Sequence, residues 1–120
     1  MSDRIIKYGF REDYPPFEKK DIFEMVGPGW SAILDKLIDD LFDLGWDGRV
    51  HQVKEKFGGL RFYIGSGDDA VFDRIAKAEN DSYDTCEVCG EPGKARKGGW
   101  IQTLCDAHAE DRPAFKPFEY

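Results

Sequence analysis

The segment CEVCGEPGKARKGGWIQTLCDAHA, residues 86–109, holds every cysteine of the 120-residue chain and one of its two histidines. Its cysteines and histidine form two pairs with the same internal spacing, Cys86-x2-Cys89 and Cys105-x2-His108. Two such pairs, separated by a hairpin-sized gap, have the spacing that a tetrahedral zinc site uses. We therefore predict one Zn²⁺ per chain, bound by Cys86, Cys89, Cys105 and His108.

The predicted donor set is closed, because three thiolates and one imidazole fill four coordination positions and leave none for water or substrate. The site is therefore expected to be structural. Gly90 can adopt positive φ and let a turn wrap around the thiolates. Residues 98–104, GGWIQTL, predict a strand returning to the metal, and CDAHAED predicts a short helix that ends at Pro113. A turn, a hairpin and a helix start favour a treble-clef-like finger, and a zinc-ribbon-like finger is the alternative.

Three cations lie between the two ligand pairs, at Lys94, Arg96 and Lys97. They could offset the net charge of −1 that three thiolates and a divalent cation create, or they could contact phosphates or carboxylates of a partner. Three charges make a small footprint, so solvated side chains are the simpler interpretation. We keep the three residues as candidate partner-binding residues.

Upstream of the finger, residues 28–84 show a change of periodicity that predicts an α+β core. WSAILDKLIDDLFDLG repeats apolar residues at three- and four-residue steps, which predicts an amphipathic helix ending before Gly45. RVHQVKEKFGGLRFYIGSG predicts an antiparallel β-hairpin with strands at 49–57 and 60–64 and a turn at Gly58-Gly59. SGDDAVFDRIAKAENDSY then predicts a second helix, with Ser66 or Asp68 as its N-cap.

The polar face of the first predicted helix carries a row of acids at Asp35, Asp39 and Asp43. These residues are spaced one helical turn apart, about 6 Å each. A solvated helix face is the ordinary interpretation. The alternative is a contact surface for a basic partner, so the three aspartates are candidate partner-binding residues as well.

The termini are expected to lie outside this α/β core. The segment DYPPFEKKDIFEMVGPG, residues 13–29, predicts that residues 1–27 form an irregular arm, which ends at the Gly-Pro-Gly break and lies on the core through Tyr14, Phe17, Ile22 and Phe23. The predicted organisation is therefore an N-terminal arm (1–27), an α/β core (28–84), a zinc finger (85–112) and a C-terminal tail (113–120).

Composition narrows the classes of function. The chain has 24 acids and 17 bases, a net charge of −7, which argues against general nucleic-acid affinity and favours a protein or small-molecule partner. It has no run of 18 apolar residues, so no membrane span is expected, and MSDRIIKYGF lacks the apolar core of a signal peptide. A cytoplasmic location is expected, where thiols stay reduced and bind metal.

Three segments also resemble a known family: GPGW with ILDKL, then VKEKFGGLRFY, then CEVCGEPG…GGWIQTLCDAHA. They are similar to a family of small, mostly uncharacterised zinc-finger proteins from bacteriophages, prophages and their bacterial hosts. The resemblance covers residues 27–109. It implies a mobile-element accessory protein with zinc-type ligands at the same four positions, and it implies no established activity.

These observations favour a binding module over an enzyme. The second histidine, His51, has no neighbouring serine, cysteine or paired carboxylate that would suggest catalysis, so a structural or surface role is expected. We expect a small acidic zinc-containing protein that binds and blocks a host or bacterial protein, such as a defence protein, in the host cytoplasm. The alternative is a zinc-finger nucleic-acid-binding or transcription-regulatory protein. The identity of the partner and the oligomeric state stay open.

Overall fold

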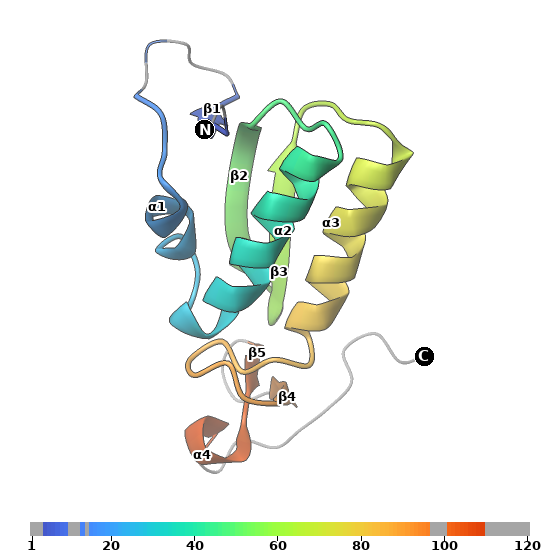
Figure 1. Cartoon of the computed structure of the whole chain (residues 1–120). Coiled ribbons are helices and arrows are strands. Elements are labelled where there is room, and N and C mark those ends of the chain that lie inside the picture. The colour runs from blue at the N-terminus through green and yellow to red at the C-terminus, as the bar shows by residue number, and fades with distance from the viewer. Residues whose placement is uncertain (1–3, 10–12, 14, 97–100, 110–120) are drawn as a thin grey trace.

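The computed structural model of the chain describes residues 4–9, 13, 15–96 and 101–109 (Figure 1). Helices and strands are mixed along the described chain, and the predicted α+β class is confirmed. In order the elements are β1 (Lys7–Tyr8), α1 (Lys19–Phe23), the 3₁₀ turn η1 (Pro28–Trp30), α2 (Ser31–Asp43), β2 (Arg49–Lys56), β3 (Gly59–Ile64), α3 (Asp69–Ser82), β4 (Lys94–Arg96), β5 (Gln102–Leu104) and α4 (Asp106–Ala109).

Helix α2 forms where the apolar periodicity predicted a helix. Its buried side chains recur at three- and four-residue steps and face the sheet, whereas the polar side chains face outward. The helix stops before Gly45, whose φ of 98° is a left-handed conformation that suits glycine after a helix. The buried stripe of α2 comprises Leu34, Leu37, Ile38 and Leu41.

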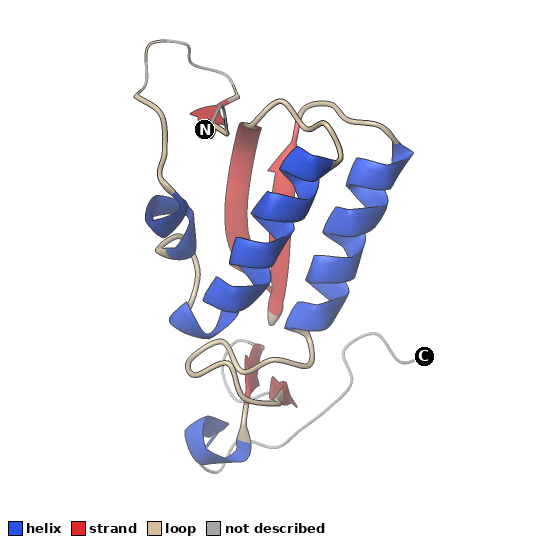
Figure 2. Ribbon diagram, viewed as in Figure 1, coloured by secondary structure: helices blue, strands red, loops and turns tan. Residues whose placement is uncertain are grey.

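Helix α3 lies beside α2 on the same face of the sheet (Figure 2). Of the two N-caps that the sequence offers, Asp68 is the one used, because its carboxylate accepts a 3.1 Å hydrogen bond from the Val71 amide. Val71, Ile75 and Ala78 form the buried stripe of α3. The two helices therefore cover one face of the hairpin and enclose the core.

The hairpin turn lies one residue earlier than the sequence predicted. Phe57 and Gly58 form the turn, with φ of 53° and 82°, and Gly59 already pairs with Lys56 in the strands. A two-residue hairpin turn of this type needs positive φ at both central residues, and this requirement sets the register. Gly59 serves a different purpose, because a Cβ there would lie 2.3 Å from the Tyr83 ring.

The free edge of β3 is covered by side chains of α3. The Leu60 amide donates to Ser82 Oγ at 2.8 Å, and the Phe62 amide donates to Glu79 Oε2 at 3.0 Å. Strand β1 runs parallel to β2 on the other side and completes the order β1-β2-β3. Helix side chains thus satisfy amides that would otherwise face solvent at a sheet edge.

The N-terminal arm is more regular than predicted. It contributes β1 to the sheet and contains the short helix α1, which begins with reciprocal hydrogen bonds between Glu18 and Asp21. Ile22 is fully buried, and Phe17 and Phe23 pack against the core, as expected. The predicted contact through Tyr14 lies outside the described residues.

The region after α3 forms a small unit at one end of the core (Figure 1). It consists of a turn, the two-stranded sheet β4–β5 and the single-turn helix α4, with its own small cluster of buried residues. We call residues 85–109 the metal unit. Its predicted end (110–112) and the predicted tail (113–120) lie outside the described residues, and none of the described helices is long and apolar enough to cross a membrane.

Candidate metal centre

The first ligand pair sits on a tight turn that follows α3. The chain reverses between Cys86 and Cys89, with the Gly90 amide donating to the Cys86 carbonyl at 2.9 Å and the Cys86 amide donating to the Glu91 carbonyl at 2.8 Å. Gly90 has a φ of 84°, so the glycine is required by the backbone at this point, as expected. The turn directs both thiols to the same side.

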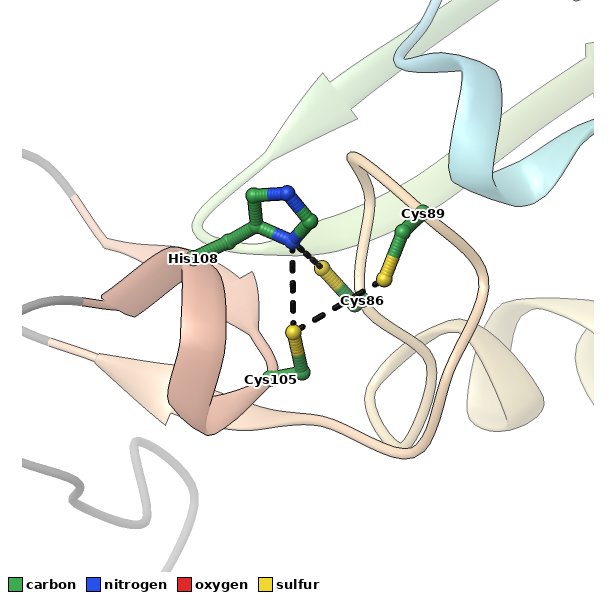
Figure 3. A group of neighbouring side chains, drawn as sticks. All are labelled: Cys86, Cys89, Cys105 and His108. Atoms are coloured by element: carbon green, nitrogen blue, oxygen red, sulfur yellow. Dashed lines mark hydrogen bonds between the residues drawn. The ribbon is translucent and has the colours of Figure 1, made fainter.

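The second pair sits at the start of α4. The amides of His108 and Ala109 donate to the Cys105 carbonyl at 3.2 and 2.9 Å, which forms the first helical turn. Residues three apart on a helix lie on the same face, so Cys105 and His108 converge. Figure 3 shows their side chains directed at those of the first pair.

The four ligand atoms fit around one metal ion. All of them lie within 4.8 Å of one another. Cys89 Sγ is 3.7 Å from Cys105 Sγ, and His108 Nδ1 is 3.7 Å from Cys86 Sγ and 3.2 Å from Cys105 Sγ (Figure 3). A tetrahedral zinc with Zn–S bonds of about 2.3 Å has sulfur atoms about 3.8 Å apart. None of the three cysteines is in a disulfide bond. The arrangement is therefore compatible with a bound metal ion, as the sequence predicted.

Electrostatics at the cluster favour thiolates on the two least exposed cysteines. Burial raises the pKa of the Cys86 thiol. Hydrogen bonds from the backbone amides of Cys105, Cys89 and Val88 lower it by more, so the resulting pKa is about 6. The backbone amide of His108 lowers the pKa of Cys105. Aligned amides thus stabilise the form of sulfur that binds metal.

The neighbouring thiols also shift the pKa values of the other two donors, His108 and Cys89. Hydrogen bonds to Cys105 and Cys86 raise the pKa of the His108 imidazole. At Cys89 the Glu91 amide lowers the pKa, but burial and the neighbouring thiols outweigh it and raise the pKa overall. Thiolates at this cluster place negative charge between the four side chains, and a divalent cation bound there would balance that charge.

The metal unit is joined to the core through residues directly before α2. Trp30 is fully buried, and its Nε1 donates to the Thr85 carbonyl at 2.9 Å. The Gly29 amide donates to the Glu87 carbonyl at 2.8 Å. A Cβ at Gly29 would lie 2.0 Å from the Cys86 carbonyl oxygen, so this position admits no side chain. This contact was not predicted from the sequence, although the glycines on either side of Pro28 were a visible signal.

A second contact connects the hairpin turn with β5. Thr103 Oγ1 donates to the Gly58 carbonyl at 2.6 Å, and the Thr103 carbonyl accepts from the Glu87 amide at 3.0 Å. Thr103 is fully buried. One residue of the metal unit therefore links the core hairpin to the turn that carries the first ligand pair.

The predicted acidic row is bridged by cations of the N-terminal arm. Lys19 Nζ lies 2.8 Å from Asp35 and 2.7 Å from Asp39, and Arg4 pairs with Asp43 and Asp39. The aspartates are about half exposed, yet their charge is partly neutralised within the chain. The sequence did not reveal this, because Lys19 and Arg4 reach α2 through the fold of the arm.

The predicted basic loop separates into residues with different environments. Arg96 is buried and donates to the Leu104 carbonyl at 3.1 Å and to Asp106 at 2.9 Å. Its guanidinium also lowers the pKa of Asp106. Lys94 is exposed, and Lys97 lies outside the described residues. Arg96 therefore stabilises the metal unit internally, whereas partner contacts by the loop stay a prediction.

His51 lies in β2, outside the metal cluster, at the point where the β2–β3 register shifts. A Cβ at Gly9 would lie 2.0 Å from its Cδ2 atom, and a Cβ at Gly65 would lie 2.7 Å from its Nε2 atom. Two glycines thus make space for the ring, which fits the structural role expected for His51.

Comparison with known proteins adds no relative: the chain matches no family model, no curated protein and no solved structure. The resemblance to phage and prophage proteins therefore stays an expectation.

Proposed function

We propose that Cys86, Cys89, Cys105 and His108 bind one Zn²⁺ and that this ion is structural. The ligand chemistry supports zinc, since thiolate and imidazole donors in tetrahedral arrangement are those that structural zinc sites use. The order of elements supports a treble-clef-like finger over a zinc ribbon. The first pair is on a turn, β4–β5 is a hairpin, and the second pair is on the first turn of α4.

The function that follows is stoichiometric binding of a partner without turnover. One observation supports this proposal: four protein donor atoms lie within 4.8 Å of one another, and four donors are the number that fills a tetrahedral zinc shell. A metal in such a shell has no position for a substrate or an activated water. The metal's role is to hold a binding surface in shape.

The partner in this proposal is a protein, and the resemblance to phage proteins is the reason for proposing a protein of the bacterial host that the chain blocks. Contact through Asp35, Asp39 and Asp43 would have to replace the bridges made by Lys19 and Arg4. A basic partner that displaces both cations from α2 can do so, because exposed ion pairs contribute little stability.

The metal half of the proposal is tested by elemental analysis of freshly purified protein. We expect one zinc per chain, and less than half of that in the His108→Ala variant. His51→Ala is the matched control, because it removes the other histidine and leaves the ligand set complete. If the His108→Ala variant keeps its full zinc content, His108 is not a zinc ligand.

The binding half is tested by capture from host lysate followed by titration of the purified partner. We expect saturation at a fixed molar ratio. Processing of excess partner by a small amount of the protein would show turnover and overturn the proposal.

A further inference from the structure

The outer face of the β2–β3 hairpin, opposite the helices, is basic. Inward side chains are buried, as Val53 and Phe62 illustrate, whereas Lys56 and Tyr63 are exposed. By strand alternation the outward positions of β2 and β3 carry Arg49, Gln52, Lys54, Lys56, Arg61 and Tyr63, and none of these is acidic. The whole chain has a net charge of −7, so the positive charge of this face is opposite in sign to the net charge of the protein.

Three of these cations lie close together, and no acidic residue in the described part of the chain pairs with them. Lys54 pairs directly with Arg61 across the strands, and Lys56 follows on the same face. Like charges placed opposite each other destabilise a sheet. Within the described part of the chain Lys54, Lys56 and Arg61 take part in no ion pair. An anionic ligand would relieve this repulsion.

Each of these cations lies beside an aromatic ring. Lys54 Nζ is 5.9 Å from the centre of the Tyr63 ring, and Lys56 Nζ is 5.7 Å from that of Phe57. Arg61 Cζ is 5.8 Å from the Tyr83 ring centre, and its Nη2 donates to the Tyr83 hydroxyl at 2.8 Å. We call Lys54, Lys56, Arg61, Phe57, Tyr63 and Tyr83 the cation–aromatic face.

Phe57 occupies a position that the backbone disfavours for a bulky residue. Its φ of 53° is left-handed, and at this place in a two-residue hairpin asparagine, aspartate or glycine is the usual choice. Burial of the ring in the core does not offset the cost of this backbone conformation, because 56% of Phe57 is exposed. A strained, exposed aromatic residue is typical of a ligand-binding position.

We propose that the cation–aromatic face binds single-stranded nucleic acid. Lys54, Lys56 and Arg61 contact phosphates, while Tyr63 and Phe57 stack on unpaired bases. Single strands offer both groups at once, and stacking on aromatic rings within a basic surface is how proteins bind them without sequence preference. An acidic protein segment would satisfy the cations and leave the rings unused, and a duplex keeps its base faces inside the stack.

This proposal goes beyond the protein-binding function and can hold without it. The negative net charge is compatible with it, because the acidic row lies on α2, in the other layer of the fold, and is bridged by Lys19 and Arg4. Charge of opposite sign on two faces orients a charged ligand as it approaches.

The first measurement is fluorescence anisotropy of labelled 20-nucleotide dT and U strands with the zinc-loaded protein. We expect binding in 50 mM salt that weakens by about 20-fold in 200 mM salt, since three phosphate contacts give a logarithmic slope of about −2. Absence of binding at 50 mM salt, or equally tight binding of a 20-base-pair duplex, would overturn the proposal.

Charge variants locate the site. Lys54→Ala/Lys56→Ala is expected to weaken binding at least about tenfold and to reduce the salt slope by about 1.4. Lys36→Ala/Lys77→Ala is the matched control, since it removes the same charge from exposed positions on the helices. Equal weakening in both variants would mean that net charge, and not this face, determines binding.

Variants of the aromatic rings test whether the ligand of this face is a nucleic acid or an acidic protein. Tyr63→Leu keeps a similar volume and is expected to weaken binding by about tenfold, the value of one stacked base. Phe57→Asn is expected to weaken binding while the Tm rises, because asparagine suits the left-handed turn; a rise in Tm excludes misfolding as the cause. Unchanged binding in both variants, or competition by polyglutamate as strong as by an oligonucleotide, would overturn the assignment.

Discussion

The core and the metal unit achieve stability by different means. The core encloses fifteen buried apolar residues, from Ile6 to Ala78, in one continuous cluster. The buried apolar cluster of the metal unit has four members, Cys86, Leu104, Cys105 and Ala109, and two of them are proposed ligands. A region of this size cannot bury enough surface to fold alone, and the metal ion that we propose would take the place of a hydrophobic core there.

The comparison also shows that the two regions are not independent. Trp30 belongs to the core cluster and hydrogen-bonds the start of the metal unit, and Gly29 packs directly on the first ligand turn. The core offers a rigid surface on which the ligand turn rests. A metal unit that folds on this preformed surface loses less conformational entropy than the same unit would lose on its own, because the core already fixes part of its backbone.

Metal removal should give the largest effect and separate the two regions. Zinc binding in comparable small fingers is worth about 10–16 kcal/mol at neutral pH. On chelation, or in Cys105→Ser, we expect residues 85–109 to lose protection in hydrogen exchange followed by mass spectrometry. Residues 31–82 should keep theirs, because their apolar cluster is complete without the metal. Simultaneous loss of protection throughout the chain would show a single cooperative unit.

The reverse experiment weakens the core. Leu37 is fully buried on α2, so Leu37→Ala should lower the free energy of unfolding by about 2–5 kcal/mol. Zinc content at room temperature should stay at one equivalent, since the cavity lies away from the ligands. Denaturant titration and metal analysis test the two statements separately. Loss of zinc from folded Leu37→Ala protein would contradict the separation.

A substitution at the joint should affect both regions moderately. In Gly29→Ala the new Cβ meets the Cys86 carbonyl oxygen, which cannot move without distorting the ligand turn. We expect a loss of about 1–3 kcal/mol, as for other overpacked sites, together with faster zinc transfer to a chelator. Gly45→Ala is the control, because it strains a left-handed glycine far from the ligands and should leave zinc transfer unchanged.

The smallest expected effect is a pH dependence within the core. Arg74 hydrogen-bonds Asp40 at 2.8 Å and, with help from Lys36, lowers the pKa of that carboxyl. A carboxyl with a lowered folded pKa stabilises the fold above its unfolded pKa, near 4, and this stabilisation disappears as pH falls through the folded value. Asp40→Asn should therefore be less stable than the parent at pH 7, and the difference should shrink at pH 3.

Denaturant titration at both pH values measures this difference. Asp81→Asn is the control, since its partner Lys77 is exposed and the pair contributes little. A gap between parent and Asp40→Asn that is as large at pH 3 as at pH 7 would exclude the Arg74 pair as its source.

Much of the fold follows from local pattern. The apolar stripe of α2, the alternation in β3 and the spacing of the four candidate ligands depend on residues near one another in the chain. Periodicity and spacing therefore predicted the two main helices, the hairpin and the donor set. The order of turn, hairpin and helix in the metal unit followed from the same local signals.

Features that depend on distant residues were not predicted. Two residues of β1 pair with β2 across more than forty positions, and a strand that short has no sequence signature. The bridges from Lys19 and Arg4 to α2 arise from the path of the arm. The turn at Phe57-Gly58 was placed one residue late, because Gly-Gly is the stronger local signal and a left-handed phenylalanine is rare.

The capped edge of β3 has a consequence for self-association. Exposed strand edges are templates on which further chains add, and this is a common beginning of aggregation. Here Ser82 and Glu79 occupy the amides of Leu60 and Phe62 that an incoming strand would need. The hairpin can present a broad, ring-bearing outer surface and still resist edge-to-edge polymerisation along β3 at high concentration.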